Sequence, residues 1–332
     1  MALQGRVEQA WQQGHPLLWL LLPLTALFIL ITTVRRALYR LGLKRQPVLA
    51  VPVVVVGNIS VGGNGKTPTV LYLIDLLQRQ GYRPGIISRG YGGKATRYPL
   101  WVSADTPASE CGDEPALMAQ RTGVPVVVGP DRVAAAQRLI DSGEVDIIVS
   151  DDGMQHYRLG RTLEVAVIDG QRRFGNGHRL PMGPLRESVA RLQHCDLIIN
   201  NGGPAQSGEA LMTLAPEAWR RVDSGAQAAP DGPCVAMAGI GHPPRFFATL
   251  AQLGIPVVAQ HGFADHQAFD AAQLDRITPT GHALLMTEKD AVKCRSFARP
   301  NWYYLPVTAS LGPDFDSQFM AKLKEKLDGV RQ

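Results

Sequence analysis

Short apolar runs alternate with amphipathic stretches along most of the chain. The first half contains VPVVVVG, PGIISRG, VPVVVG and VDIIVSDD, and the second contains LEVAVID, CDLIIN, PCVAMAG, IPVVAQ, HALLMTEKD and NWYYLPV. Each run has the length of one buried strand. Strands that alternate with helices form parallel sheets covered by helices, so the pattern predicts an α/β fold.

The clearest predicted helix follows the first run and extends from Lys66 to Gly81, with apolar side chains at helical spacing. The stretches GGPAQSGEALMTLAP and GAQAAPDG are rich in Gly, Ala and Pro, and they predict loops or a weak edge strand. A chain of 332 residues is long enough for two ordinary domains. We place the change near residue 160, which gives domains at residues 46–160 and 161–332. The last helix could pack back on the first domain.

The N-terminal segment follows a different pattern, because residues 16–34 (PLLWLLLPLTALFILITTV) contain no charged side chain. As a helix they extend about 28 Å, against a membrane hydrocarbon core of about 30 Å. A basic flank follows at once, and it consists of Arg35, Arg36, Arg40, Lys44 and Arg45. The other side offers only Arg6 and Glu8, so the flank and everything after it should be cytoplasmic. Residues 1–45 are therefore predicted to be a membrane-anchoring helix with its basic flank.

Two other interpretations of this segment exist. A cleaved signal peptide is disfavoured, because the basic cluster follows the apolar run and no small-x-small cleavage site follows it. A buried core helix is the second alternative. Whether a membrane helix crosses the bilayer or lies in its cytoplasmic face, bent at Pro23, the sequence leaves open.

Composition and charge fit a globular protein with anionic partners. Apolar residues make up 45% of the chain and charged residues 19%. The net charge of +5 favours nucleotides, nucleic acid or acidic lipid headgroups as partners. The four cysteines are scattered without a Cys-x-x-Cys pair, which suggests neither a zinc site nor a disulfide framework. We infer a reducing, cytoplasmic setting.

The sequence SVGGNGKT, directly after the first apolar run, is typical of a phosphate-binding loop. Its last three residues match the P-loop pattern Gly-x-x-x-x-Gly-Lys-Ser/Thr, whereas Ser60 replaces the first glycine. Glycines let successive backbone N–H groups turn toward one anion, and the helix N-terminus adds partial positive charge. Lys66 is expected to reach the terminal phosphates and Thr67 to offer its hydroxyl to Mg²⁺. The predicted cradle consists of Ser60, Gly62, Gly63, Asn64, Gly65, Lys66 and Thr67. The alternative is a glycine-rich turn with a solvated lysine.

Acidic residues supply candidates for the metal and for a catalytic base. Asp151 and Asp152 end an apolar run, and either could hold Mg²⁺ directly or through water. ECGDEP contributes Asp113 and Glu114, and FADHQAF contributes His266. A carboxylate hydrogen-bonded to a histidine could accept a hydroxyl proton. A helix N-cap and an ordinary surface histidine are the alternatives, and the residues alone leave this pairing open.

Seven ordered motifs together resemble one family. They are SVGGNGKTP, SRGYGG, GDEP, DDGMQH, GPLRE, FADHQAF and TEKDAVK, and they follow an apolar N-terminal helix. This order resembles the tetraacyldisaccharide 4'-kinases of lipid A biosynthesis over essentially the whole chain. The resemblance includes Ser60, so this serine departs from the general P-loop pattern but not from the family.

The resemblance implies a fold and an activity. The expected fold is a P-loop NTPase-type α/β/α sandwich with a second, smaller α/β lobe that closes over the nucleotide. The implied activity is ATP- and Mg²⁺-dependent phosphorylation of the 4'-hydroxyl of an acylated glucosamine disaccharide 1-phosphate, which makes lipid IVA at the cytoplasmic face of a Gram-negative inner membrane. The implied catalytic residues are Asp113 and His266, with Lys66 on the phosphates. No nucleic-acid partner is expected, and a monomer is the default.

The resemblance also assigns further residues. Arg89, Tyr91, Arg132 and His156 would line the sugar and its 1-phosphate, with surface cations and a glycine-rich turn as the alternative. Arg186 would stabilise phosphate or sit in a structural ion pair. Asp290 would recognise the base, unless TEKD is only a helix start capped by Thr287. Glu114 would interact with Mg²⁺ without binding the ion directly.

A different class of protein also fits the phosphate-binding loop. A membrane-tethered nucleotide switch would use hydrolysis of ATP or GTP to bind and release a protein partner. The acceptor separates the two hypotheses, because only the kinase requires an acylated disaccharide.

Overall fold

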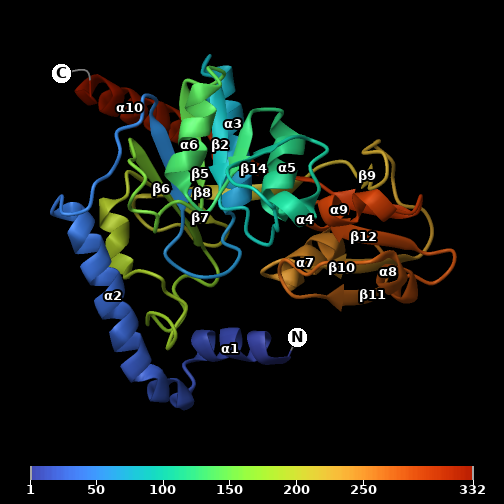
Figure 1. The fold of residues 1–332 in the computed structure, drawn as a ribbon. Coiled ribbons are helices and arrows are strands. Elements are labelled where there is room, and N and C mark those ends of the chain that lie inside the picture. Colours follow the sequence, from blue (N-terminus) through green and yellow to red (C-terminus); the bar gives the residue numbers. More distant parts are fainter. Residues whose placement is uncertain (1, 331–332) are drawn as a thin grey trace.

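A computed structural model describes residues 2–330, which form two β-sheets flanked by helices (Figure 1). The larger sheet has nine strands in the order β14-β8-β7-β6-β1-β5-β2-β4-β3. In chain order its strands are β1 (Val53–Gly57), β2 (Pro84–Ser88), β3 (Leu100–Val102), β4 (Val126–Val128), β5 (Ile147–Asp151), β6 (Leu163–Asp169), β7 (Leu197–Asn201), β8 (Glu209–Pro216) and β14 (Val307–Ser310). Its central strands are parallel, as the alternation of runs predicts.

The second sheet has five strands in the order β11-β10-β12-β13-β9. They are β9 (Arg220–Arg221), β10 (Cys234–Ala238), β11 (Val257–Gly262), β12 (Ala283–Thr287) and β13 (Trp302–Leu305). All ten apolar runs predicted as strands therefore contain one. The helices beyond residue 60 are α3 (Lys66–Arg79), α4 (Ala108–Cys111), α5 (Asp113–Thr122), α6 (Arg132–Asp141), η2 (Val189–His194), α7 (Pro243–Gln252), α8 (Ala271–Ile277), α9 (Glu288–Cys294), η3 (Arg295–Phe297) and α10 (Pro313–Val330).

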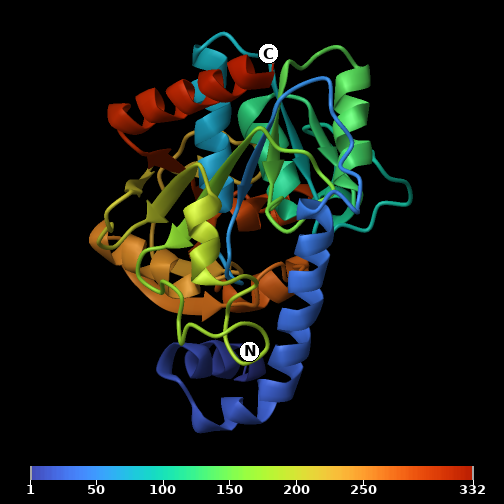
Figure 2. The same ribbon diagram turned by 90° about the vertical axis from the view of Figure 1, so that its left-hand side faces the viewer.

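Two apolar layers hold helices against the larger sheet. All five residues of β1 are buried, and alternate valines of this strand face opposite layers. One layer contains side chains of α3, α5 and α10, including Leu73, Met118 and Phe319. The other contains side chains of α6 and of the segment around Leu185. The architecture is the expected α/β/α sandwich with a smaller second α/β lobe, visible in Figures 1 and 2.

The larger sheet does not end near residue 160. β6, β7 and β8 follow that position and remain in the larger sheet, and β14 joins it after the second sheet is complete. The helix α10 then packs on the larger sheet through Phe315, Phe319 and Leu323. We therefore propose that the lobes follow the sheets, with the second lobe beginning after β8 and ending before β14.

The prediction of loops or a weak edge is wrong for Glu209–Pro216, which forms β8. This strand pairs with β7 on one side and β14 on the other, so it is not an edge. Of its side chains only Met212 is buried. Backbone pairing rather than apolar periodicity holds the strand in place, and this explains why the hydrophobic pattern does not reveal it.

The N-terminal segment forms α1 (Ala2–Gln13), η1 (Pro16–Leu21) and α2 (Leu22–Arg40). In Figures 1 and 2, α2 runs along the side of the larger lobe and extends past it to α1. Thr25 is the one buried residue recorded in α2, which contradicts the buried-core interpretation. The stretch Pro16–Arg40 is long and apolar enough to cross a membrane, and it could tether the chain there.

Candidate active site

The phosphate-binding loop joins β1 to α3 with the backbone that its glycines predict. Gly62 and Gly65 have φ angles of +100° and +98°, in the region that favours glycine. Asn64 donates a hydrogen bond from Nδ2 to Oγ of Ser60 at 2.8 Å. Asn201, at the end of β7, donates from Nδ2 to the carbonyl oxygen of Asn64 at 3.0 Å. Ser60 is buried and supports the loop from within, whereas Gly62 to Thr67 line the main cavity.

The side chains of Lys66 and Arg186 both form ion pairs with Asp152. Nζ of Lys66 is 3.7 Å from Oδ1 of Asp152, and Nη1 of Arg186 is 3.0 Å from Oδ2. Burial alone would raise the pKa of Asp152, but the charges of Lys66 and Arg186 outweigh it and lower this pKa. Of the two interpretations of Arg186, the structure contains the ion pair.

Asp151 is the more deeply buried member of the acidic pair, at 1% exposed. Its Oδ2 accepts a hydrogen bond from Oγ of Ser88 at 3.0 Å, while its Oδ1 is buried without a hydrogen-bond partner. Burial, followed by the charges of Glu114 and Asp152, raises the pKa of Asp151 to about 7. A buried carboxylate oxygen without a partner, in a cavity that Thr67 also lines, fits a hard cation such as Mg²⁺.

Within residues 2–330, no three Asp, Glu, His or Cys side chains converge on a ready-made metal site. This arrangement still suits Mg²⁺, which usually takes one or two carboxylates and completes its shell with water and substrate phosphate oxygens.

Asp113 and His266 form the predicted pair across the two lobes. Nδ1 of His266 lies 2.8 Å from Oδ1 and 3.1 Å from Oδ2 of Asp113. Asp113 is 4% exposed at the start of α5, whereas His266 lines the cavity, with its ring centroid 4.8 Å from that of Tyr91. The histidine has a φ of +59°, a backbone conformation that is uncommon for residues other than glycine.

The two groups shift each other's proton affinity. Burial alone would raise the pKa of Asp113, but the hydrogen bond from His266 and the charge of Lys289 outweigh it and lower this pKa. Burial alone would lower the pKa of His266, but the hydrogen bond and charge of Asp113 outweigh it and raise this pKa. The pair therefore favours an ionised carboxylate beside a histidine that holds its proton more tightly than usual.

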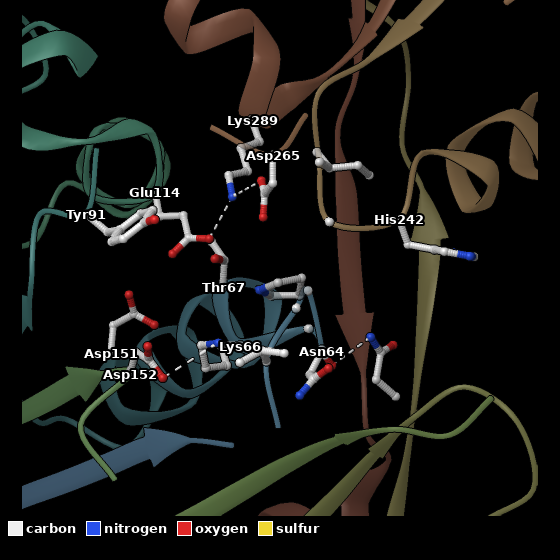
Figure 3. A pocket seen from close by; sticks show the side chains of 18 of the residues that line it. Asn64, Lys66, Thr67, Tyr91, Glu114, Asp151, Asp152, His242, Asp265 and Lys289 are labelled. Carbon is white, nitrogen blue, oxygen red and sulfur yellow. Dashed lines mark hydrogen bonds and ion pairs between the residues drawn. The ribbon is translucent and has the colours of Figure 1, made fainter. Parts of the chain in front are cut away.

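Lys289 connects the acidic groups around this pair, and no role is predicted for it from the sequence. Its Nζ lies 2.8 Å from Oε1 of Glu114, 3.0 Å from Oδ1 of Asp265 and 3.8 Å from Oδ2 of Asp113. Figure 3 shows Lys289, Asp265 and Glu114 together on one side of Thr67, with Asp151 and Asp152 on another. Burial alone would lower the pKa of Lys289, but the charge of Glu114, with that of Asp113, raises it. Its position in TEKD, within one of the seven motifs, is the signal that could have found it.

The residues predicted to bind the sugar lie on the same cavity, which has a volume of about 2030 Å³. Arg89, Tyr91, Arg132 and His156 all line it. Arg132 is buried, donates from Nη1 to the carbonyl of Gly129 at 2.9 Å, and leaves Nε without a partner. Burial, and then the charge of Arg132, lowers the pKa of His156 to about 4. This wall therefore combines cations with a neutral histidine.

The cavity also reaches the N-terminal helices. Val7 and Trp11 of α1, and Phe28, Thr32 and Arg35 of α2, complete its lining. A single space thus extends from the phosphate-binding loop to the apolar segment.

Asp290 is not among the residues that line this cavity. It is fully buried, and its Oδ2 accepts hydrogen bonds from the backbone N–H of Gly239 at 3.0 Å and from Oγ1 of Thr287 at 2.7 Å. Thr287 in turn accepts from the backbone N–H of Asp290 and caps α9. The capping alternative is the one observed. The cavity wall beside α3 is apolar, with Leu71, Leu117, Met212, Leu214 and Val307.

Comparisons with known proteins agree with this geometry. Residues 17–326 match the family model described as tetraacyldisaccharide-1-P 4'-kinase. A tetraacyldisaccharide 4'-kinase from Shewanella sp. strain MR-4 is 54% identical over 324 residues, which cover 97% of this chain and 96% of that protein. The enzyme of the same name from Shewanella frigidimarina is 53% identical over 325 residues, with the same coverage of 97% and 96%.

A solved structure shares the fold. It is a crystal structure of the "apo" form of LpxK from Aquifex aeolicus in complex with ATP. The superposition has a TM-score of 0.77 with 29% sequence identity, and it covers 92% of this chain and 99% of the other.

Proposed function

Because the chain belongs to the tetraacyldisaccharide-1-P 4'-kinase family, we propose that its central cavity transfers the γ-phosphate of ATP to the 4'-hydroxyl of a tetraacylated glucosamine disaccharide 1-phosphate. The product is lipid IVA, an intermediate of lipid A biosynthesis. The observation that supports this function most directly is the continuity of one cavity from the phosphate-binding loop past the Asp113–His266 pair to the apolar N-terminal helices.

The phosphate-binding loop holds the triphosphate of ATP. Backbone N–H groups from Gly62 to Thr67 and the positive end of α3 surround the phosphates, and Lys66 leaves Asp152 to reach the terminal groups. The adenine lies on the apolar wall beside α3, and no base recognition is assigned to Asp290.

Asp151, Asp152 and Thr67 would hold Mg²⁺, and Glu114 would support the ion from its position beside Lys289. Bound there, the ion supplies neutralisation of the negative charge on the transferred phosphoryl group. Arg186 keeps Asp152 ionised and in place for this role.

The Asp113–His266 pair accepts the proton of the 4'-hydroxyl. Nδ1 of His266 is engaged with Asp113, which leaves Nε2, 3.6 Å from Oδ2 of Asp265, as the atom that takes up the proton. Asp113 then stabilises the imidazolium. Lys289 supplies a fixed positive charge between Glu114 and Asp265, which keeps this acidic corner from repelling the phosphates.

Arg89, Tyr91, Arg132 and His156 bind the disaccharide and its 1-phosphate. The buried guanidinium of Arg132 has an Nε without a partner, and a phosphate oxygen would satisfy it. The acyl chains remain in the bilayer, because each CH₂ exposed to water costs about 0.8 kcal/mol. The enzyme therefore acts at the cytoplasmic face of the bacterial inner membrane, held there by residues 16–40.

The decisive experiment measures acceptor dependence in detergent micelles that hold the full chain. With ATP and Mg²⁺, the kinase forms a phosphorylated lipid only when the acylated disaccharide 1-phosphate is present, and chelation of Mg²⁺ stops turnover. Equal release of ADP with and without the disaccharide would refute the kinase and favour the nucleotide switch.

A further inference from the structure

A carboxylate at the end of β6 connects three parts of the molecule. Asp169 is 2% exposed, and both of its oxygens are engaged. Oδ1 accepts hydrogen bonds from the backbone N–H groups of Gln171 at 3.0 Å and Arg172 at 2.9 Å. Oδ2 accepts from Nε of Arg172 at 3.0 Å and from Nη2 of Arg245 at 3.1 Å. Two arginines from different lobes therefore share one buried carboxylate.

The first arginine braces the phosphate-binding loop from outside. Nη2 of Arg172 donates to the carbonyl oxygen of Gly63 at 2.7 Å and to Oδ1 of Asn64 at 3.3 Å. A Cβ atom added to Gly62 would lie 3.1 Å from Nη1 of Arg172, so the guanidinium lies directly against the loop. A loop that turns its N–H groups toward an anion turns carbonyl groups away from it, and Arg172 satisfies one of them.

The second arginine belongs to the second lobe. Arg245 lies in the first turn of α7, and the chain just before this helix touches the same loop. A Cβ atom added to Gly241 would lie 2.6 Å from the backbone nitrogen of Gly63. Only glycine permits this close approach. The second lobe thus contacts Gly63 directly through Gly241. Through Arg245 it also contacts Asp169, the carboxylate that holds Arg172 on Gly63.

Charge supports this arrangement. Burial alone would raise the pKa of Asp169, but the backbone hydrogen bond and charge of Arg172, together with the charge of Arg245, outweigh it and lower this pKa. The carboxylate is therefore ionised at neutral pH, and loss of either arginine would leave its charge less well compensated.

We propose that Asp169 is a positioning residue that couples docking of the second lobe to the shape of the phosphate-binding loop. Asp169 acts on the loop through Arg172 and on the second lobe through Arg245. The inference rests on the proposed function for the identity of the loop's ligand, ATP. Because ATP binding and lobe docking stabilise the same arrangement of Asp169, each favours the other.

The test uses the full chain in micelles and three variants. Arg245→Gln removes the ion pair between Asp169 and the second lobe and leaves Arg172 on the loop. Asp169→Asn weakens the pairs with both arginines. Glu209→Gln is the matched control, because Glu209 pairs with Arg173 at 2.8 and 2.9 Å, one residue beyond Arg172, and makes no recorded contact with the loop. The readouts are the Kd for ATP by calorimetry without acceptor, and hydrogen exchange of amides 60–67.

We expect Arg245→Gln to raise the Kd for ATP about fivefold or more, and Asp169→Asn to raise it further, in the range typical of coupled sites. Amides 60–67 should exchange faster in both variants, and the KM for the disaccharide should not change. Glu209→Gln should keep the Kd within about twofold, even if it lowers the melting temperature.

A Kd for ATP that is unchanged in Arg245→Gln would overturn the coupling. An equal rise in Glu209→Gln would show that only general stability is involved. Arg245 is partly exposed, with 29% of its side chain accessible, so this variant still decides the question if Asp169→Asn does not fold. ATP affinity is measured without acceptor, so a wild-type chain that binds ATP but phosphorylates no disaccharide refutes the proposed function alone.

Discussion

At the scale of single residues, the proposed proton transfer depends on the contact between His266 and Asp113. Asp113 is buried, sits outside the phosphate-binding loop and is not among the residues that line the cavity. Replacing it with alanine should therefore leave the affinity for ATP close to wild type while kcat falls about 10²-fold or more. Steady-state kinetics and calorimetry check this. Asp75→Ala, on the exposed face of α3, is the control and should change neither value. A loss of ATP affinity as large as the loss of kcat would make Asp113 a metal or structural residue.

The same contact predicts how stability depends on pH. The pKa of Asp113 is lowered in the fold, so its contribution is present above about pH 4 and is lost as the pH falls through the lowered value. The pKa of His266 is raised, so its contribution is present below about pH 6.5 and is lost as the pH rises through the raised value. The melting temperature of the wild type should exceed that of His266→Gln most between about pH 4 and 6.5. A difference that does not vary with pH would contradict the ionic pairing.

A residue's role could be predicted from the sequence when its partners are close to it along the chain. The loop from Ser60 to Thr67 follows a strand directly, so its chemistry can be recognised from a short stretch of sequence. Asp113 and His266 are 153 positions apart, and only the family resemblance brings them together before the structure does. Lys289 lies in one of the seven motifs, which marks the residue but not its partners, whereas Arg245 lies in none of them. The partners of both depend on where the second lobe meets α5 and β6.

At the scale of elements, the junction between β1 and α3 is held by a neighbouring strand. Gly65 has a φ of +98°, and a Cβ there would lie 2.3 Å from Nδ2 of Asn201 on β7. Gly65→Ala should therefore displace the side chain that donates to Asn64, in addition to about 1 to 2 kcal/mol of backbone strain. We expect the KM for ATP to rise about tenfold or more, as measured by initial rates at saturating disaccharide.

The control for this change lies at the other end of the same helix. Gly81 has a φ of +84°, but a Cβ there would meet nothing within 4 Å. Gly81→Ala therefore introduces similar backbone strain without the clash. It should lower the melting temperature and leave the KM for ATP unchanged. Equal effects on the KM in both variants would mean that strain, rather than the contact with Asn201, sets the shape of the loop.

The elements differ in how clearly the sequence marks them. Strands such as β1 and β5 are buried on both faces and are therefore continuous apolar runs. In β8 only Met212 is buried, and in the short β9 neither arginine is. Such strands depend on partners brought from elsewhere in the chain. The larger sheet extends past residue 160 because strand pairing, which the apolar pattern does not encode, places β6, β7 and β8 in the same sheet as β1.

At the scale of the whole molecule, α2 carries exposed apolar side chains on one side and cavity-lining side chains on another. Leu27 and Ile31 are 52% and 57% exposed on α2, while Phe28 and Thr32 of the same helix line the cavity. Under the proposed function, one face of the helix would contact the bilayer and the other the substrate. This division predicts that membrane binding can be removed without disturbing the nucleotide site.

The double substitution Leu27→Lys and Ile31→Lys tests this division. Each lysine at the centre of an apolar membrane helix costs about 2.5 to 3.5 kcal/mol, so the pair should weaken binding to phosphatidylglycerol-containing vesicles by about 10³-fold or more. The KM for disaccharide presented in such vesicles should rise, while the Kd for ATP stays the same, because neither side chain faces the cavity.

Val258→Lys, at an equally exposed apolar position on β11, is the control and should leave sedimentation with vesicles unchanged. If the double variant still sediments like the wild type at high salt, the apolar face is not what holds the chain to the membrane. If its Kd for ATP rises instead, α2 supports the nucleotide site, and the two faces are not independent.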